Sequence, residues 1–216
     1  MRKLILKMSM SLDGFVGGPN GEIDWIFKSF DESINEWTEN ILWQAGVHIM
    51  GSRTFHDMAS YWPFSTETLA APMNKIPKVV FTRKSYLELT IPELTTQALK
   101  DATINSEGLF NTSDEVSLHA STWNHPKVAN GDLENEILRL KQQEGSFIIA
   151  HGGAGFAQSL VASGLIDEYH LLIHPVILGK GLPLFSAISA PANLKLVSST
   201  PFKTGVIAIV YLPSIG

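Results

Sequence analysis

The chain has 216 residues, 16 of them Lys or Arg and 21 Asp or Glu, so its formal net charge is −5. It has no cysteine, which excludes disulfides, thiol nucleophiles and cysteine-ligated metal sites. Hydrophobic residues make up 44% of the chain and charged residues 17%, a balance that can build a packed core and is not that of a disordered protein. The acidic charge disfavours nucleic acid as a partner, and the length predicts a single domain over residues 1–216.

No targeting or membrane-spanning segment is predicted. The start, MRKLILK, is apolar only up to Lys7 and lacks a cleavage site, so it is not typical of a signal peptide. No apolar run reaches the roughly 18 residues that a transmembrane helix needs. We therefore expect a cytoplasmic protein that has no membrane partner.

The first quarter of the chain predicts a strand, a turn and a helix. Apolar residues alternate over residues 3–10, which is typical of a strand with a buried face. The glycine-rich stretch Asp13–Gly21 cannot be a regular element. Apolar residues then recur at helical spacing from Asp31 to about Ala45, and Asp31 or Ser33 is the expected N-cap.

The remaining elements alternate in the same way. Short buried strands are predicted at Val47–Met50, Val79–Phe81 and Phe147–Ile149, and helices at Leu133–Gln143 and 156–163. This alternation predicts an α/β fold of three layers, in which helices cover both faces of a mostly parallel central sheet.

The C-terminal part predicts strands only. A long strand is expected at Glu168–Leu178, and two more strands between Leu194 and Leu212 predict an antiparallel edge to the sheet. Residues 85–118 are polar with scattered apolar positions, and we interpret them as an excursion within the domain.

Glycines, cations and hydroxyls follow three of the predicted strands. The segment HGGAGF, residues 151–156, joins a buried strand to a helix, which is the arrangement that binds phosphate when it is not simply a tight turn. Gly51–Phe55 (GSRTF) and Thr82–Ser85 (TRKS) close two other strands. Ligands gather at the carboxyl ends of strands in open α/β sheets. Arg83 and Lys84 there favour a phosphorylated cofactor with a 2′-phosphate, NADPH over NADH, unless they are ordinary surface charges.

Five motifs together resemble one superfamily. They are SLDGFVGG (Ser11–Gly18), IMGSRTF (Ile49–Phe55), KVVFTRK (Lys78–Lys84), FIIAHGGAGFAQSLV (Phe147–Val161) and GLIDEYHLLIHPVILGKGLPLF (Gly164–Phe185). Their order and type resemble the dihydrofolate reductase-like superfamily, and most of all the C-terminal reductase domain of bifunctional riboflavin-biosynthesis deaminase/reductases and their stand-alone relatives. The resemblance implies an eight-stranded, mostly parallel sheet that binds NADPH, and a homodimer in which the region of the Glu168–Leu178 strand takes part.

The resemblance also implies roles for individual residues. Positions in five segments match those that contact the cofactor diphosphate, its 2′-phosphate and its nicotinamide. The implied cofactor-binding residues are Ser9, Met10, Val16, Gly17, Trp25, Arg53, Thr54, Phe55, Thr82, Arg83, Lys84, Gly152, Gly153, Ala154, Gly155 and Phe156. The chain departs from the riboflavin-type pattern where a Glu usually precedes the glycine turn, because Ala150 and His151 stand there, and His56–Phe64 lacks the usual arginines.

A proton donor and a substrate site are the least determined features. Asp13, at a strand end beside the expected nicotinamide, is the candidate catalytic acid, although Asp-Gly is also a common turn pair. Asp24 and Asp31 are candidate substrate ligands whose alternative is helix capping. Trp62 is a candidate for stacking on a flat substrate ring, and its alternative is core packing.

The seven histidines predict no metal site, because they show no ligand spacing on a helix. The predicted function is an NADPH-dependent reductase of a pterin- or pyrimidine-like heterocycle, of the 5-amino-6-(5-phosphoribosylamino)uracil reductase or dihydrofolate reductase kind. The alternative is an NADPH-binding module of this fold that has no turnover.

Overall fold

A computed structural model of the chain describes residues 1–84 and 121–214, and the predicted excursion at residues 85–118 lies outside them. Eight strands in the described part form one sheet, in the order β4-β3-β2-β5-β1-β6-β8-β7. The strands are β1 (Leu4–Ser11), β2 (Val47–Gly51), β3 (Lys78–Phe81), β4 (Lys127–Ala129), β5 (Ile148–Ala150), β6 (Glu168–His174), β7 (Leu194–Pro201) and β8 (Ile207–Pro213).

The first six of these strands in chain order run parallel. β1 pairs in parallel with β5 and β6, β2 with β3 and β5, and β3 with β4. β8 pairs antiparallel with β6 and β7 and so forms the C-terminal edge. Because six strands share one direction, their carboxyl ends meet at a single edge of the sheet, where α/β proteins bind ligands.

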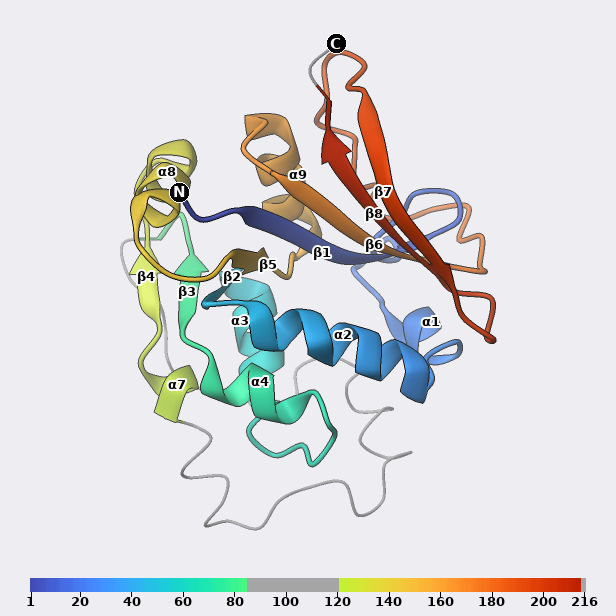
Figure 1. Cartoon of the computed structure of the whole chain (residues 1–216), viewed down its shortest axis with the longest axis horizontal. Helices are drawn as coiled ribbons and strands as arrows, with labels where there is room; N and C mark the ends of the chain where they lie inside the picture. Colours follow the sequence, from blue (N-terminus) through green and yellow to red (C-terminus); the bar gives the residue numbers. More distant parts are fainter. Residues whose placement is uncertain (85–120, 215–216) are drawn as a thin grey trace.

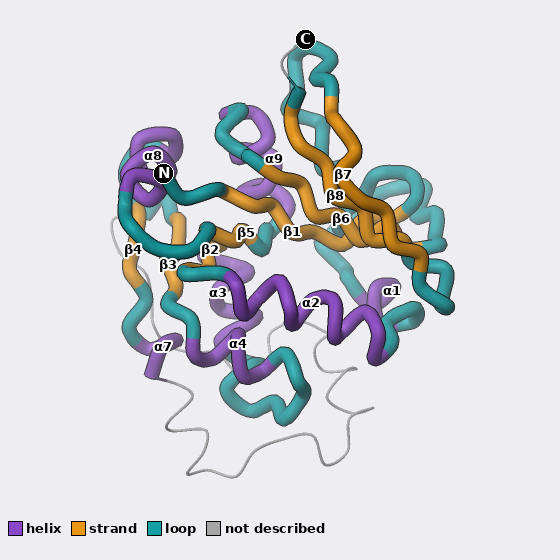
Figure 2. The backbone as a smooth tube through the Cα atoms, in the orientation of Figure 1, coloured by secondary structure: helices purple, strands orange, loops and turns teal. Residues whose placement is uncertain are grey.

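Helices cover both faces of the sheet (Figure 1), and the predicted fold class is confirmed. Figure 2 shows α8 and α9 on one side of the orange strands and α2, α3 and α4 on the other. The helices are α1 (Asp24–Phe27), α2 (Glu32–Gln44), α3 (Ser52–Ala59), α4 (Ala70–Lys75), α7 (Ser121–Asn124), α8 (Leu133–Gln142) and α9 (Ala154–Ser163).

The alternation of β1 separates two cores. Leu4 and Leu6 are fully buried and pack with Ile137 of α8 and Leu160 of α9. The intervening side chains point to the other face, where Ile5 lines a cavity with α2. A second apolar cluster fills the space between this face and the helices α2, α3 and α4.

Side-chain caps begin two of the helices as their sequences indicate. The Asp31 carboxylate accepts a hydrogen bond of 3.0 Å from the Ile34 amide at the start of α2, and this predicted N-cap is confirmed. Asp132 caps α8 in the same way through the Asn135 amide. Each cap satisfies an amide that the first helical turn leaves without a partner.

The predicted strand Glu168–Leu178 was too long, because β6 ends at His174. Pro175 has no amide hydrogen to extend the ladder, and the chain turns there as the Val176 amide bonds back to the His174 carbonyl at 2.8 Å. The short helices α1, α4 and α7 were not predicted, since single turns leave little periodicity to recognise.

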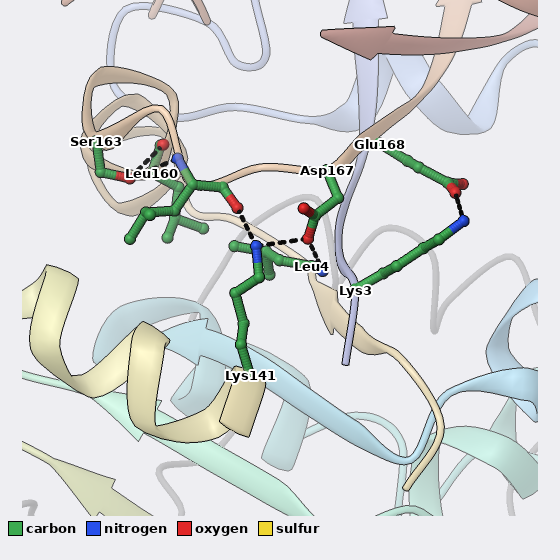
Figure 3. Close-up of polar contacts among 8 residues, drawn as sticks. Lys3, Leu4, Lys141, Leu160, Ser163, Asp167 and Glu168 are labelled. Atoms are coloured by element: carbon green, nitrogen blue, oxygen red, sulfur yellow. Dashed lines mark hydrogen bonds and ion pairs between the residues drawn. The ribbon is translucent and has the colours of Figure 1, made fainter. Parts of the chain in front are cut away.

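Ion pairs fasten the amino-terminal edge of the sheet (Figure 3). The Lys141 ammonium of α8 contacts the Asp167 carboxylate at 2.6 Å, and the same carboxylate oxygen accepts the Leu4 amide at 2.6 Å. Lys3 pairs with Glu168 at 2.7 Å. These contacts hold α8 against the first residues of β1 and β6.

No helix in residues 1–84 and 121–214 is long and apolar enough to cross a membrane.

The core on the α9 side gives a direct test of the packing. Leu160 is fully buried, so Leu160→Ala removes packed methyl groups and leaves a cavity. We expect a loss of about 2–5 kcal/mol in the free energy of unfolding. The neighbouring Ser159→Ala, whose hydroxyl bonds only its own helix, is expected to cost less than about 0.5 kcal/mol. Urea unfolding of both variants measures the difference, and equal losses would contradict this packing.

Candidate functional site

A glycine turn joins β5 to α9 at the carboxyl edge of the sheet. The turn contains a cis peptide bond between Gly152 and Gly153. The Gly152 carbonyl accepts the Gly51 amide at 3.2 Å, and the Gly153 amide donates to the Thr54 hydroxyl at 2.6 Å. The turn after β5 is thus bonded to the turn after β2, and two of the motifs singled out from the sequence meet in space.

Side chains larger than hydrogen do not fit this turn. A Cβ on Gly153 would lie 2.8 Å from the Thr54 hydroxyl, and one on Gly152 would lie 2.8 Å from the Met8 sulfur. Gly152 also has a φ of +94°, which favours glycine. The backbone on the outer side of the turn is therefore free of side chains, as close approach of a ligand requires.

Two helices begin at this edge without a side-chain cap. Gly153 is the N-cap of α9 and Gly51 is the N-cap of α3, and neither helix receives a side-chain hydrogen bond at its start. Their first-turn amides and dipoles favour a bound anion. A Cβ on Gly155, in the first turn of α9, would meet nothing within 4 Å, so the space over this helix end is open.

The end of β3 lies beside α9. The rings of Phe81 and Phe156 are 4.9 Å apart, and the Thr82 hydroxyl accepts the Lys84 amide at 3.1 Å. Arg83 and Lys84 are exposed to solvent. This strand end therefore presents two exposed cations next to a strand that packs against α9.

Asp13 fastens the loop that follows β1. Its carboxylate accepts the amides of Leu178 and Gly179 at 3.1 and 2.7 Å and the hydroxyl of Ser11 at 2.7 Å. The hydrogen bond from Ser11 and those from the backbone lower the pKa of the Asp13 carboxyl, which is exposed. Asp13 therefore stays ionised at neutral pH and ties its loop to the segment after β6.

The same two loops are joined further along. The Val16 amide donates to the Leu182 carbonyl and the Leu182 amide to the Gly17 carbonyl, both at 2.9 Å. A Cβ on Gly181 would lie 2.3 Å from the Gly17 carbonyl oxygen, so only glycine permits this contact. The motifs SLDGFVGG and GKGLPLF thus form one paired structure at the end of β1.

The predicted substrate residues Asp24, Asp31 and Trp62 and the predicted cofactor residue Trp25 belong to three separate segments of the chain. Asp31 is occupied as the N-cap of α2, and Asp24 lies in the first turn of α1. Trp25 is buried, and its indole N–H donates to the Glu22 carbonyl at 3.1 Å. Its ring meets the ring of His174, the last residue of β6, edge-on. Trp62 is half-buried against the apolar cluster below α3.

A row of basic side chains crosses the face of the sheet that α2 and α4 cover, and it was not predicted. It runs from Lys7 on β1 through His151 after β5 and His48 on β2 to Lys78 on β3. Two ring nitrogens, Nε2 of His151 and Nδ1 of His48, are 3.1 Å apart. His48 and Lys78 are direct cross-strand partners. We call these four residues the basic row.

Every member of the basic row has a lowered pKa, which leaves the two histidines neutral and Lys7 mostly charged at neutral pH. Burial lowers the pKa of Lys7 to about 8 and that of Lys78 to about 7. Burial and the two lysines lower the pKa of His151 to about 3, and burial, His151 and Lys78 keep that of His48 well below 6.5. In the described part of the chain, no carboxylate forms an ion pair with any of the four.

The sequence does carry a signal for this row. Lys7 and His48 lie within apolar strands, Lys78 begins one and His151 directly follows one, and the period of two directs all four to one face. The histidines were weighed for a metal site and Lys7 and Lys78 were given no role, so the common face was overlooked. No group of three or more metal-ligating side chains occurs among residues 1–84 and 121–214.

The basic row predicts that acid destabilises the protein. His48 and His151 have pKa values below 6.5 in the folded state, so the unfolded chain takes up protons first as the pH falls below about 6.5. Lys7 and Lys78 act in the same direction between their lowered values and 10.5. The free energy of unfolding should therefore rise steadily from about pH 5 to about pH 9.

Urea unfolding across this pH range measures the trend. His48→Gln/His151→Gln is the matched variant, and its rise between about pH 5 and 6.5 should be shallower than that of the parent protein. A stability that is flat or that falls with rising pH would contradict the lowered pKa values of the row.

Comparisons with known proteins agree with this architecture. A model of the RibD C-terminal domain family matches residues 2–208. The uncharacterized protein YyaP of Bacillus subtilis (strain 168) is 29% identical over 210 residues, which cover 97% of this chain and 94% of YyaP.

Two solved structures share the fold at low identity. A pyrimidine reductase-like protein from Corynebacterium diphtheriae has a TM-score of 0.63 at 15% identity, covering 100% of this chain and 93% of that chain. Dihydrofolate reductase from Enterococcus faecalis, solved with NADP(H), has a TM-score of 0.56 at 12% identity, covering 99% of this chain and 97% of that chain.

Proposed function

This chain belongs to the RibD C-terminal domain family, and from that premise we propose that it is an NADPH-dependent reductase of a pterin- or pyrimidine-like heterocycle. The observation that carries the proposal is the glycine turn at Gly152 and Gly153, bonded to Thr54 between two helix N-termini that lack side-chain caps. Such a cradle of free amides fits the diphosphate of a dinucleotide. The nicotinamide supplies the hydride when the cofactor is bound.

Three strand ends would hold the cofactor. The amides of residues 154–156 and the start of α3 with Arg53 and Thr54 would bind the diphosphate. Thr82, Arg83 and Lys84 would bind the 2′-phosphate, because exposed cations and a hydroxyl next to the cradle match its charge. Phe55 and Phe156 would support these groups from the core, where Phe55 is buried.

The nicotinamide would lie at the end of β1. Ser9 and Met10 are half-buried there, and Val16 and Gly17 belong to the loop that is bonded to the segment after β6. Because this loop is fastened by backbone hydrogen bonds and by Asp13, it would exclude water from the ring without a large closing motion.

The substrate would lie on the α2 side of β1. On that face, Lys7 is the side chain before Ser9 along β1. His151 lies beside Lys7, because it follows Ala150, the residue of β5 that pairs with Leu6. Lys7, half-buried with a pKa of about 8, is a proton donor near neutral pH and stands as a second candidate beside Asp13. A homodimer and a cytoplasmic location stay predictions.

Cofactor preference tests the proposal first. Arg83→Ala/Lys84→Ala should weaken NADPH binding by at least about tenfold and leave NADH binding nearly unchanged, because only NADPH carries the 2′-phosphate. Calorimetric titration of the variant and the parent protein with both dinucleotides measures the difference. Lys195→Ala, which removes one exposed cation from the far edge strand, is the control.

Equal losses for the two dinucleotides would contradict the role of the cations. Failure of the parent protein to bind either dinucleotide would contradict the proposed function. Binding without oxidation of NADPH across a panel of dihydropterins and aminopyrimidines would favour the alternative, a cofactor-binding module, which the His151 departure from the family pattern supports.

Asp13→Asn distinguishes a loop clamp from a proton donor. An asparagine keeps one acceptor oxygen for the Leu178 and Gly179 amides but cannot donate an acidic proton. If Asp13 is the clamp that its hydrogen bonds indicate, the variant should retain turnover with the parent pH profile, and hydrogen exchange should rise at residues 12–18 and 176–182. Loss of turnover by about 10²-fold or more with unchanged exchange would instead make Asp13 the acid.

A further inference from the structure

Unpaired polar atoms gather under α2. Five buried side-chain atoms have no hydrogen-bond partner in the described part of the chain, and four of them lie on this face: Thr38 Oγ1, His48 Nε2, His170 Nδ1 and His174 Nε2. Buried polar groups are normally paired, so such a concentration calls for a physical reason. A polar ligand that completes the pairing is one.

Basic groups outnumber acidic ones on this face. Lys7 lies opposite His170 in the β1–β6 ladder, and Lys7 lowers the pKa of His151, His170 and His174 in addition to the effect of burial. Glu168 is the carboxylate nearest along β6, and its two oxygens are already engaged by Lys3 and His170. The face therefore has an excess of basic groups over acids.

Acidic groups on the elements packed above do not offset this excess. Glu32 and Glu36 of α2 are exposed, and Glu39 accepts a hydrogen bond from Trp43 at the surface. Asp31 caps the helix, and Ser29 before it bonds His174 at 2.8 Å. On the sheet itself, β2 and β3 contribute the bases of the row.

We propose that the substrate site under α2 takes an oxyanion, a planar carboxylate carried by a small ring, which binds between Lys7 and His151. This inference rests on the proposed function for the placement of the substrate on the α2 side of β1. Both residues are half-buried, so they are the members of the basic row that a ligand can reach.

A carboxylate there reverses the electrostatics of the row. The bound anion favours the charged form of each neighbouring base, so ligand binding is accompanied by proton uptake. A cationic amidine meets the opposite response, because Lys7 repels it and no carboxylate in the described residues of this face is free to pair with it. The site therefore selects an acceptor-rich, anionic ring over a cationic one.

Three probes of one shape and different charge test this selection. Benzoate, benzamide and benzamidine carry negative, neutral and positive groups on the same ring. Each is titrated into the full chain at neutral pH while NMR follows the Cε1–H signals of the histidines, and calorimetry in two buffers of different ionisation enthalpy measures proton uptake. Benzoate should bind at least about tenfold more tightly than benzamide and shift the His151 signal with net proton uptake. Benzamidine should leave that signal unchanged.

Variants locate the effect. Lys7→Met should abolish the preference for benzoate and raise the stability of the free protein, because it removes a desolvated cation. Lys195→Met, an exposed lysine on β7, is the matched control and should change neither. If Lys7→Met fails to fold, Lys7→Gln serves with the same expectation.

The inference is overturned by tighter binding of benzamidine than of benzoate, or by benzoate binding that survives both Lys7 substitutions. No response of any histidine to benzoate up to its solubility limit would also overturn it. None of these readouts needs cofactor, so loss of NADPH binding would refute the proposed function and leave the oxyanion site to be judged by its own result.

Discussion

The bond between the Gly153 amide and the Thr54 hydroxyl is the contact on which the proposed site depends. The carboxyl ends of six parallel strands lie at one edge of the sheet, but the parallel arrangement does not by itself bring the loops that follow these strands into contact. This 2.6 Å bond joins the turn after β5 to α3, and the absence of a Cβ at Gly153 permits it. It leaves the starts of α3 and α9 side by side with their amides free, so a phosphate could be bound by both.

The pleat of β1 connects this edge to the basic row. Met8 faces the glycine turn, where its sulfur would contact a Cβ on Gly152, whereas Lys7 points to the opposite face under α2. Successive residues of one buried strand therefore serve the proposed cofactor side and the proposed substrate side. A reductase needs both ligands at a fixed separation, and a strand held in parallel on both sides is a rigid means of fixing it.

The sequence was sufficient for the architecture and for the turn, and insufficient for the row. Strong periodicity identified α2, α8 and α9, and the glycine spacing located the turn at Gly152, because these signals are local. Lys7 and His48 are 41 positions apart in the sequence. They come near each other only because of the strand order, in which β5 alone separates β1 from β2. The end of β6 at His174 was missed because the alternation of apolar residues continues past Pro175.

Amide NMR on addition of NADPH tests the central claim, that the glycine turn and the two neighbouring strand ends form the cofactor site. The largest changes in amide chemical shift should fall on residues 152–156, 53–55 and 82–84, which are the residues expected to contact the phosphates. The amino-terminal edge, at Lys3, Phe147 and Glu168, should remain unchanged. Shifts centred on that edge, or none at the glycine turn at a saturating concentration of NADPH, would contradict the account.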